Sequence, residues 1–291
     1  MATDAPLSPD DWTERQERTT VSVDDHEVGM AYYDSAPHHD APDARPVVFL
    51  HGIPTWSYLW RHVVPALEDE RRTIAPDMVG YGNSEMRDGF DRSLRAQETA
   101  VLDLLDQLGI GEVDVVAHDL GGGIALRMAA HTNRIEQLVL SNAVMYDSWP
   151  VEFIVNLGLP STINDMSTDQ LVDTLEGAFR ETLIDPDDTF VEAMASRYAS
   201  DTGRISLARN AISTNTSHTT EIEYDAIGAE TLCVWGENDN FQPIGFAERL
   251  MDDLDRAAGL IRLDARHWVP EDRPDEYTTH VAAFLTGDEA G

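Results

Sequence analysis

Ala117-His118-Asp119-Leu120-Gly121 is the segment most diagnostic of the fold. An apolar run precedes it and two more glycines follow, a pattern that predicts a sharp turn from a strand into a helix with a nucleophile at its centre. Such turns usually carry serine, which attacks carbonyl groups, but this one carries a carboxylate. A carboxylate is suited to displacing a leaving group from saturated carbon, which leaves an ester on the enzyme itself. Asp119 is therefore the candidate nucleophile.

The alternative role for Asp119 is an ordinary helix N-cap, because aspartate is a favoured capping residue. A cap requires neither the buried strand before it nor the small residues on both flanks, so we favour the nucleophile. The start of a helix also favours an anion, which would keep the carboxylate ionised. We expect His118 to be a packed residue of the turn.

Apolar runs on both sides of this turn predict an α/β fold with a mostly parallel sheet covered by helices on both faces. Between two of these runs, residues 94–108 repeat apolar side chains about every 3.6 positions, as in an amphipathic helix. Residues 20–23 and 28–33 alternate around an acidic turn and predict an antiparallel hairpin. The predicted parallel strands are residues 46–51, 72–77, 113–117, 135–141, 231–235 and 259–263.

Residues 148–224 interrupt the alternation of strands and helices. They contain short helical pieces and polar turns, and prolines and a glycine break the pattern at positions 150, 160, 186 and 203. The segment keeps regular apolar spacing, so we expect a helical cap inserted over the carboxyl edge of the sheet. The predicted organisation is a core made of residues 1–147 and 225–291, with a cap of residues 148–224.

Two further residues follow predicted strands and complete a candidate site. Asp239 comes just after residues 231–235, and His267 just after residues 259–263. An aspartyl ester needs a base to activate water, and the base needs an acid to hold its tautomer. In proteins with a nucleophile at such a turn, the catalytic acid and then the histidine follow the nucleophile along the chain. We therefore predict Asp119, Asp239 and His267 as catalytic residues.

The loop His51-Gly52-Ile53 follows the first long strand. Gly52 lets this loop turn back so that a backbone N–H points into the site. We predict that the backbone amides of Ile53 and Leu120 form an oxyanion hole. We expect His51 to brace the loop through hydrogen bonds and not to act as a base.

The charge of the chain is strongly one-sided. It has 54 acidic and 20 basic residues, a formal net charge of −34, and every basic residue is arginine. Such an anionic surface repels nucleic acid and anionic membranes. The composition resembles that of proteins from salt-loving archaea, whose molar salt shortens the Debye length to about 3 Å and screens this self-repulsion.

The cysteine content and the apolar stretches also bear on the class of protein. The single cysteine, Cys233, lies in an apolar run, so we expect a core residue and neither a disulfide nor a cysteine-rich metal site. Met1 to Asp11 has no apolar leader segment, and no stretch approaches about eighteen apolar residues in a row. We expect a soluble cytoplasmic protein that acts on a small molecule without cofactor, metal, nucleic acid or membrane; the oligomeric state stays open.

The motifs together resemble the α/β-hydrolase superfamily, specifically its haloalkane dehalogenase and epoxide hydrolase branch. They are residues 51–61, Asp77-Met78-Val79-Gly80-Tyr81-Gly82-Asn83-Ser84, the turn at Asp119, Asp239 and His267. The resemblance covers nearly the whole chain outside the cap. It implies an α/β-hydrolase fold with a mostly parallel central sheet flanked by helices and an inserted helical cap.

The resemblance also implies a mechanism. Asp119 attacks carbon and releases a halide or opens an epoxide. Water activated by His267 then hydrolyses the ester, while Asp239 steadies the imidazolium and the Ile53 and Leu120 amides stabilise the oxyanion.

Two residues depart from that branch. Many of its dehalogenases have tryptophan after the nucleophile and a polar residue after His-Gly, whereas this chain has Leu120 and Ile53, whose side chains donate no hydrogen bond. Epoxide opening needs proton donors above the nucleophile. The candidates for contacting the substrate or leaving group are Trp56, Tyr146, Trp149, Tyr198 and Trp268.

Four functions stay open. The leading hypothesis is a haloalkane dehalogenase-like hydrolase that forms an aspartyl ester, and the second is an epoxide hydrolase. An ester or lactone hydrolase is the third, with Asp119 as acyl acceptor or general base. A non-catalytic binding module is the fourth, and the presence of both His267 and Asp239 argues against it.

Overall fold

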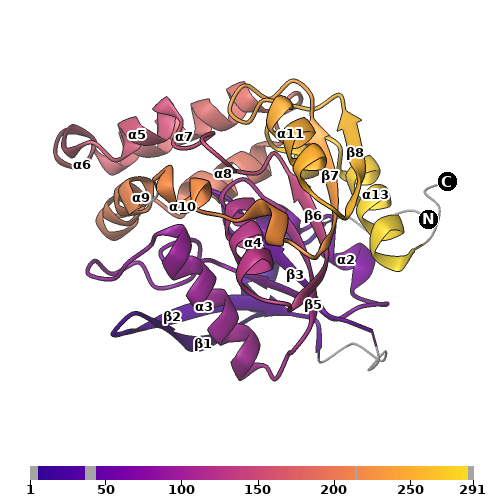
Figure 1. Ribbon diagram of the computed structural model, residues 1–291. Helices are drawn as coiled ribbons and strands as arrows, with labels where there is room; N and C mark the ends of the chain where they lie inside the picture. The colour runs from indigo at the N-terminus through magenta and orange to yellow at the C-terminus, as the bar shows by residue number, and fades with distance from the viewer. Residues whose placement is uncertain (1–5, 37–43, 214, 288–291) are drawn as a thin grey trace.

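An eight-stranded sheet forms the centre of the structure, a computed structural model that describes residues 6–36, 44–213 and 215–287 (Figure 1). The first five residues of the N-terminal segment considered above lie outside this range. The strand order is β1-β2-β4-β3-β5-β6-β7-β8. The strands are β1 (Gln16–Val23), β2 (His26–Asp34), β3 (Val47–Leu50), β4 (Thr73–Pro76), β5 (Val113–His118), β6 (Ile135–Ser141), β7 (Glu230–Gly236) and β8 (Ala257–Leu263).

The pairing confirms the predicted mostly parallel sheet. β1 pairs antiparallel with β2 and β2 with β4, whereas β4, β3, β5, β6, β7 and β8 pair in parallel. Every residue of β3, β4 and β5 is buried, as expected for parallel strands covered on both faces. The hairpin is longer than its alternation predicted, because pairing continues to Gln16 opposite Tyr33.

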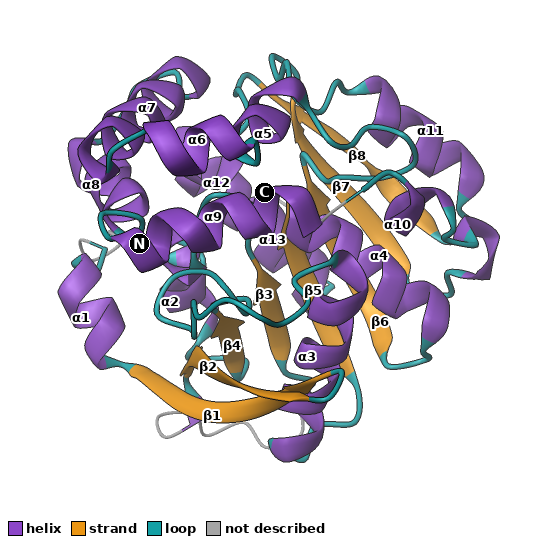
Figure 2. Cartoon of the chain, turned by 90° about the vertical axis from the view of Figure 1, so that its left-hand side faces the viewer, coloured by secondary structure: helices purple, strands orange, loops and turns teal. Residues whose placement is uncertain are grey.

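Helices cover both faces of the sheet (Figure 2). On one face lie α3 (Leu94–Gln107), α4 (Leu120–His131) and α11 (Gly245–Asp253). On the other lie α2 (Val64–Leu67), α12 (Val269–Asp272) and α13 (Pro274–Thr286). Two short elements precede them, α1 (Pro9–Glu14) and η2 (Ser57–Trp60). None of the helices in the described ranges is both long and apolar enough to cross a membrane.

The described residues between β6 and β7 form helices and loops and contain no strand. Figure 2 shows α5 to α9 gathered at one end of the sheet. This is the end where Asp119 follows β5, since one pocket is lined both by Asp119 and by residues of α5 and α7. The limits of the cap, residues 148 and 224, stay a prediction. The elements are α5 (Glu152–Leu157), α6 (Pro160–Asp165), α7 (Thr168–Thr182), α8 (Asp188–Ser196), α9 (Asp201–Ser213), α10 (Ser217–Thr220) and η3 (Tyr224–Ala226).

Candidate active site

Asp119 occupies a sharp turn between β5 and α4. Its backbone has φ 50° and ψ −121°, a region that residues with a side chain rarely adopt. The turn packs tightly, because a Cβ at Gly121 would clash with the backbone oxygen of Leu50. Although Asp119 stands at the N-cap position of α4, its side chain makes no capping hydrogen bond. The carboxylate is therefore directed to other partners.

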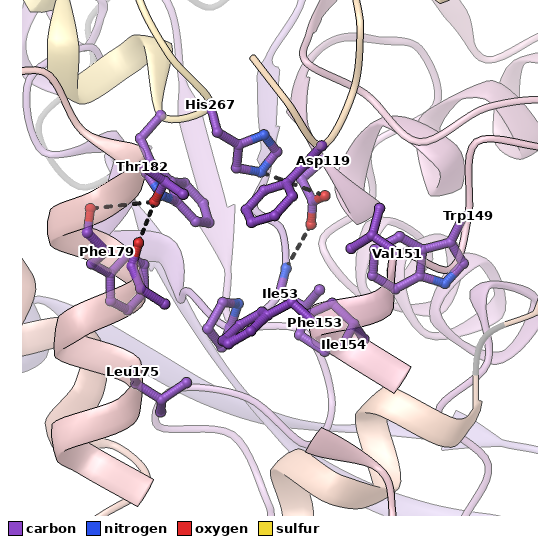
Figure 3. Close-up of a pocket in the computed structure, with 14 residues that line it drawn as sticks. Ile53, Asp119, Trp149, Val151, Phe153, Ile154, Leu175, Phe179, Thr182 and His267 are labelled. Carbon is purple, nitrogen blue, oxygen red and sulfur yellow. Dashed lines mark hydrogen bonds and ion pairs between the residues drawn. The ribbon is translucent and has the colours of Figure 1, made fainter. Parts of the chain in front are cut away.

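Two backbone amides act on the Asp119 carboxylate. The Ile53 N–H donates to Asp119 Oδ1 at 2.9 Å. The Leu120 amide opposes the rise in the pKa of the same carboxylate. Gly52 permits the approach, because a Cβ there would overlap Asp119 Oδ1. The structure thus brings the two predicted oxyanion-hole amides to the predicted nucleophile. Figure 3 shows the carboxylate between Ile53 and His267.

Asp239 and His267 lie beside this carboxylate. His267 Nε2 is 3.7 Å from Asp119 Oδ2, and His267 Nδ1 is 2.8 Å from Asp239 Oδ2. The three residues that the sequence predicted as a group are therefore within reach of one another. With Nδ1 donating to Asp239, Nε2 of a neutral His267 is free to accept a proton.

Asn142 is a fourth residue of this hydrogen-bonded group, and we did not predict it from the sequence. Its Nδ2 donates to Asp239 Oδ2 at 2.6 Å, and its Oδ1 accepts from the Gly236 N–H at 2.9 Å. The Phe241 N–H donates to the other oxygen of Asp239 at 2.7 Å. The available signal was topological, because Asn142 follows β6 directly, just as Asp119 follows β5.

The electrostatics of the group follow from burial and from these contacts. Burial raises the pKa of Asp119 above its ordinary value, although His267 and the Leu120 and Ile53 amides oppose the rise. The helix start therefore does not offset burial at this residue. Burial also acts to raise the pKa of Asp239, but His267, Asn142 and the Phe241 amide outweigh it and lower this pKa to about 2. Burial alone would lower the pKa of His267, but Asp239, Asp119 and Asp272 raise it above 6.5.

A pocket opens above Asp119 and His267 between the core and the cap (Figure 3). Asp119 and His267 are the ionisable residues among the described residues that line it. The Thr182 hydroxyl donates to the Ala178 carbonyl at 2.7 Å and is occupied there. The remaining walls are apolar: Ile53, Pro54, Trp149, Val151, Phe153, Ile154, Leu175, Ala178, Phe179, Phe241 and Trp268.

The structure places two of the five predicted substrate-contacting residues at the pocket and three away from it. Trp149 and Trp268 line the pocket, whereas Trp56, Tyr146 and Tyr198 do not. The indole N–H of Trp268 donates to Thr182 Oγ1 at 2.8 Å, and that of Trp56 to the Ala193 carbonyl at 3.2 Å. The Tyr146 hydroxyl donates to Asp253 Oδ2 at 2.7 Å, away from Asp119. Tyr198 is completely buried elsewhere.

Two other histidines near the site are buried. His51 accepts the Met78 N–H at Nε2 over 3.0 Å, and its Nδ1 is 2.9 Å from the Gly52 carbonyl oxygen. Burial lowers the pKa of His51 to about 4, so the ring stays neutral and braces the loop, as expected. The His118 ring lies 4.8 Å from the His267 ring, and burial lowers its pKa as well.

The described part of the chain offers no cluster of side chains suited to a metal ion. It contains no group of three or more histidine, cysteine, aspartate or glutamate side chains placed to hold a metal. Cys233 is buried in β7, and burial raises the pKa of its thiol to about 12. The thiol is therefore a core group, as predicted.

Curated relatives of the chain carry the names of several enzymes. A cis-3-alkyl-4-alkyloxetan-2-one decarboxylase of Shewanella oneidensis is 28% identical over 268 residues, 84% of this chain and 83% of that protein. Haloalkane dehalogenase 2 of Mycobacterium tuberculosis is 33% identical over 108 residues, 37% of each chain. A soluble epoxide hydrolase of Corynebacterium is 40% identical over 114 residues, 36% of this chain and 39% of that one. The dehalogenase and epoxide hydrolase names support a hydrolase.

The matched lengths are uneven. A second oxetan-2-one decarboxylase, from Xanthomonas campestris, is 36% identical over 128 residues, 41% of each chain. The chain thus spans about two fifths of the length of most of these curated relatives, and most of the Shewanella protein.

Solved structures and a family model agree on the fold. An alpha/beta hydrolase fold protein from Burkholderia ambifaria superposes with a TM-score of 0.79 at 23% identity, over 91% of this chain and 99% of that one. A haloalkane dehalogenase from Bradyrhizobium elkani gives 0.76 at 22% identity, over 94% and 98%. The model of the alpha/beta hydrolase fold matches residues 45–274. The chain belongs to the alpha/beta hydrolase fold family.

Proposed function

We propose that this chain is a hydrolase that acts through a covalent ester of Asp119 on a small, largely apolar substrate. One observation carries the proposal. Asp119 Oδ1 accepts the Ile53 N–H at 2.9 Å, while Oδ2 lies 3.7 Å from His267 Nε2. One oxygen is therefore held in place and the other is left to attack carbon. The relatives named haloalkane dehalogenase and epoxide hydrolase support this class of reaction.

The reaction has two steps. Asp119 Oδ2 forms a bond to carbon, and the leaving group departs with the electron pair of its bond. His267 Nε2 then takes a proton from water, whose oxygen adds to the ester carbon of Asp119. The Ile53 and Leu120 amides stabilise the resulting oxyanion, and Asp239 stabilises the imidazolium. When this intermediate collapses, the departing alkoxide takes the proton back from His267 and leaves as an alcohol. Loss of the remaining acid proton to solvent restores the Asp119 carboxylate.

A haloalkane is the first substrate candidate, and an oxetan-2-one is the second. Trp268 and Thr182 line the pocket, but the Trp268 N–H and the Thr182 hydroxyl are already hydrogen-bonded to protein groups. An epoxide leaves an alkoxide, which needs a proton donor. A lactone opened at its alkyl carbon leaves a carboxylate, which is a weak base and needs none. The Shewanella relative, matched over most of its length, carries the oxetan-2-one ring in its name.

Trapping the ester tests the proposal. The His267→Gln variant is incubated with 1-bromobutane, 1,2-epoxybutane or a cis-3,4-dialkyloxetan-2-one, and its intact mass is measured. The first step does not need the histidine but the second does, so the adduct accumulates on Asp119. The bromide adds one butyl group in place of a proton, whereas an epoxide or lactone adds its whole mass.

Molar KCl is used throughout, because the net charge of −34 opposes folding in dilute buffer. The double variant Asp119→Ala, His267→Gln is the matched control and must stay unmodified. The proposal is wrong if wild type turns a substrate over while His267→Gln carries no adduct of it on Asp119.

A further inference from the structure

One face of cap helix α7 forms a long wall of the pocket. Leu175, Ala178, Phe179 and Thr182 all line it, at positions i, i+3, i+4 and i+7 of one helix. Residues with this spacing share one face of a helix, and seven residues span about 10 Å along its axis. Figure 3 shows Thr182 near His267 and Leu175 at the far end.

The end of α7 nearest the reacting groups is fixed by hydrogen bonds. The indole N–H of Trp268, the residue after His267, donates to Thr182 Oγ1 at 2.8 Å. Arg266 Nη1 donates to the carbonyls of Glu181 and Leu183, both at 2.9 Å. Because this end is tied to the loop of His267, the wall extends away from Asp119 toward Leu175.

The facing wall is also apolar. It is formed by Val151, Phe153 and Ile154, at and just before the start of α5. Beyond the reacting groups, no described lining residue is charged along this length. A polar substituent lying there would lose its water without gaining a partner, whereas a hydrocarbon chain would gain from burial.

We propose that this space is a subsite for an unbranched hydrocarbon tail, so that the substrate is an electrophile at one end of an alkyl chain. A zigzag chain advances about 1.3 Å per carbon, given a bond of about 1.5 Å. The α7 wall is therefore about as long as a chain of eight carbons. The inference rests on the proposed function, because Asp119 defines the reacting end.

A chain-length series tests the subsite. The substrates are 1-bromoalkanes from ethyl to dodecyl and, in parallel, cis-3-alkyl-4-methyloxetan-2-ones with the same alkyl chains. We expect kcat/KM to rise about fourfold per added methylene as far as octyl and then to level off. A flat series overturns the subsite while leaving the proposed function in place. The absence of turnover and of an Asp119 adduct with every member overturns both.

Two neighbouring substitutions locate the tail. Ala178→Leu fills the middle of the wall, and we expect it to lower kcat/KM for the octyl substrate at least about tenfold while changing the ethyl substrate less than about twofold. Gly177→Leu is the matched control, because residue 177 is exposed on the same helix and a Cβ there meets no atom within 4 Å. Equal effects of both variants on the octyl substrate would contradict the placement, and thermal melts establish that each variant is folded.

Discussion

The two sides of the pocket differ in their secondary structure and in the polarity of their residues. One side is the floor, which we define as the lining residues Ile53, Asp119 and His267 with Leu120 and Asp239, which support them. These residues lie just after the ends of strands of the sheet. Backbone amides and side-chain hydrogen bonds hold these residues. The roof, which we define as the lining residues between 149 and 182, is mostly apolar and comes largely from helices α5 and α7. In the proposed function, the floor carries out the reaction and the roof selects the substrate.

This division agrees with the range of the relatives. Proteins whose names state decarboxylation of an oxetan-2-one, dehalogenation and epoxide hydrolysis all align with this chain. A fold supports many reactions, so membership in the family does not select among them. Variants on the two sides should separate the reaction from the selection of substrate.

Loss of the nucleophile should have the largest effect. Asp119→Ala removes the atom that forms the ester, so we expect kcat/KM to fall at least about a thousandfold for every substrate. Unfolding should not become easier, because burial already disfavours the charged form of Asp119. Steady-state rates and thermal melts measure the two effects. Appreciable turnover by a folded Asp119→Ala variant would remove Asp119 from the mechanism.

The sequence predicts the fold and the floor because both depend on local signals. Continuous apolar runs predict buried parallel strands, and β6 begins and ends at the predicted residues 135 and 141. Asp239 and His267 could be proposed because each follows a strand, and parallel strands bring their carboxyl ends to one edge of the sheet. Their catalytic roles stay predictions.

The roof could not be predicted, because it depends on contacts between distant residues. Five tryptophans and tyrosines were candidates, and partners far along the chain decide their places. Trp56 is bonded to Ala193 and Trp268 to Thr182, 137 and 86 positions away. The periodicity of α7 identifies its apolar face, but the packing of α5 opposite decides that this face lines a pocket. Asn142 was not predicted, because its partners Asp239 and Gly236 lie 97 and 94 positions away.

The second step should respond to Asp239. Asp239→Asn removes the charge that raises the pKa of His267, and we expect ester hydrolysis to slow about 10²-fold to 10⁴-fold. Alkylation of Asp119 should change far less, because it needs no base. Rapid quench with detection of the alkyl-enzyme separates the two rates.

The pH profile of the same variant gives an independent measurement. Only neutral His267 accepts a proton from water, so hydrolysis by wild type should increase as the pH rises through a His267 pKa above 6.5. Asp239 stays ionised across this range, because its pKa is lowered to about 2. In Asp239→Asn the rising limb should move to lower pH. The control Asp264→Asn changes a mostly exposed carboxylate and should leave the limb in place. An unmoved limb in Asp239→Asn would show that Asp239 does not set the basicity of His267.

Thr182 is a roof residue hydrogen-bonded to Trp268, the neighbour of the floor residue His267, and its variant should have the smallest effect. Thr182→Val keeps the shape of the side chain but removes the acceptor of the Trp268 N–H, and the Trp268 ring lies 4.5 Å from that of His267. We expect hydrolysis of the ester to slow about threefold to tenfold, with alkylation unchanged, because His267 loses part of its support. Thr174→Val is the matched control, since Thr174 donates to the Gln170 carbonyl on an exposed part of the same helix. If both variants slow hydrolysis equally, or if Thr182→Val slows alkylation by the same factor, the roof does not position His267 and the two sides of the pocket act independently.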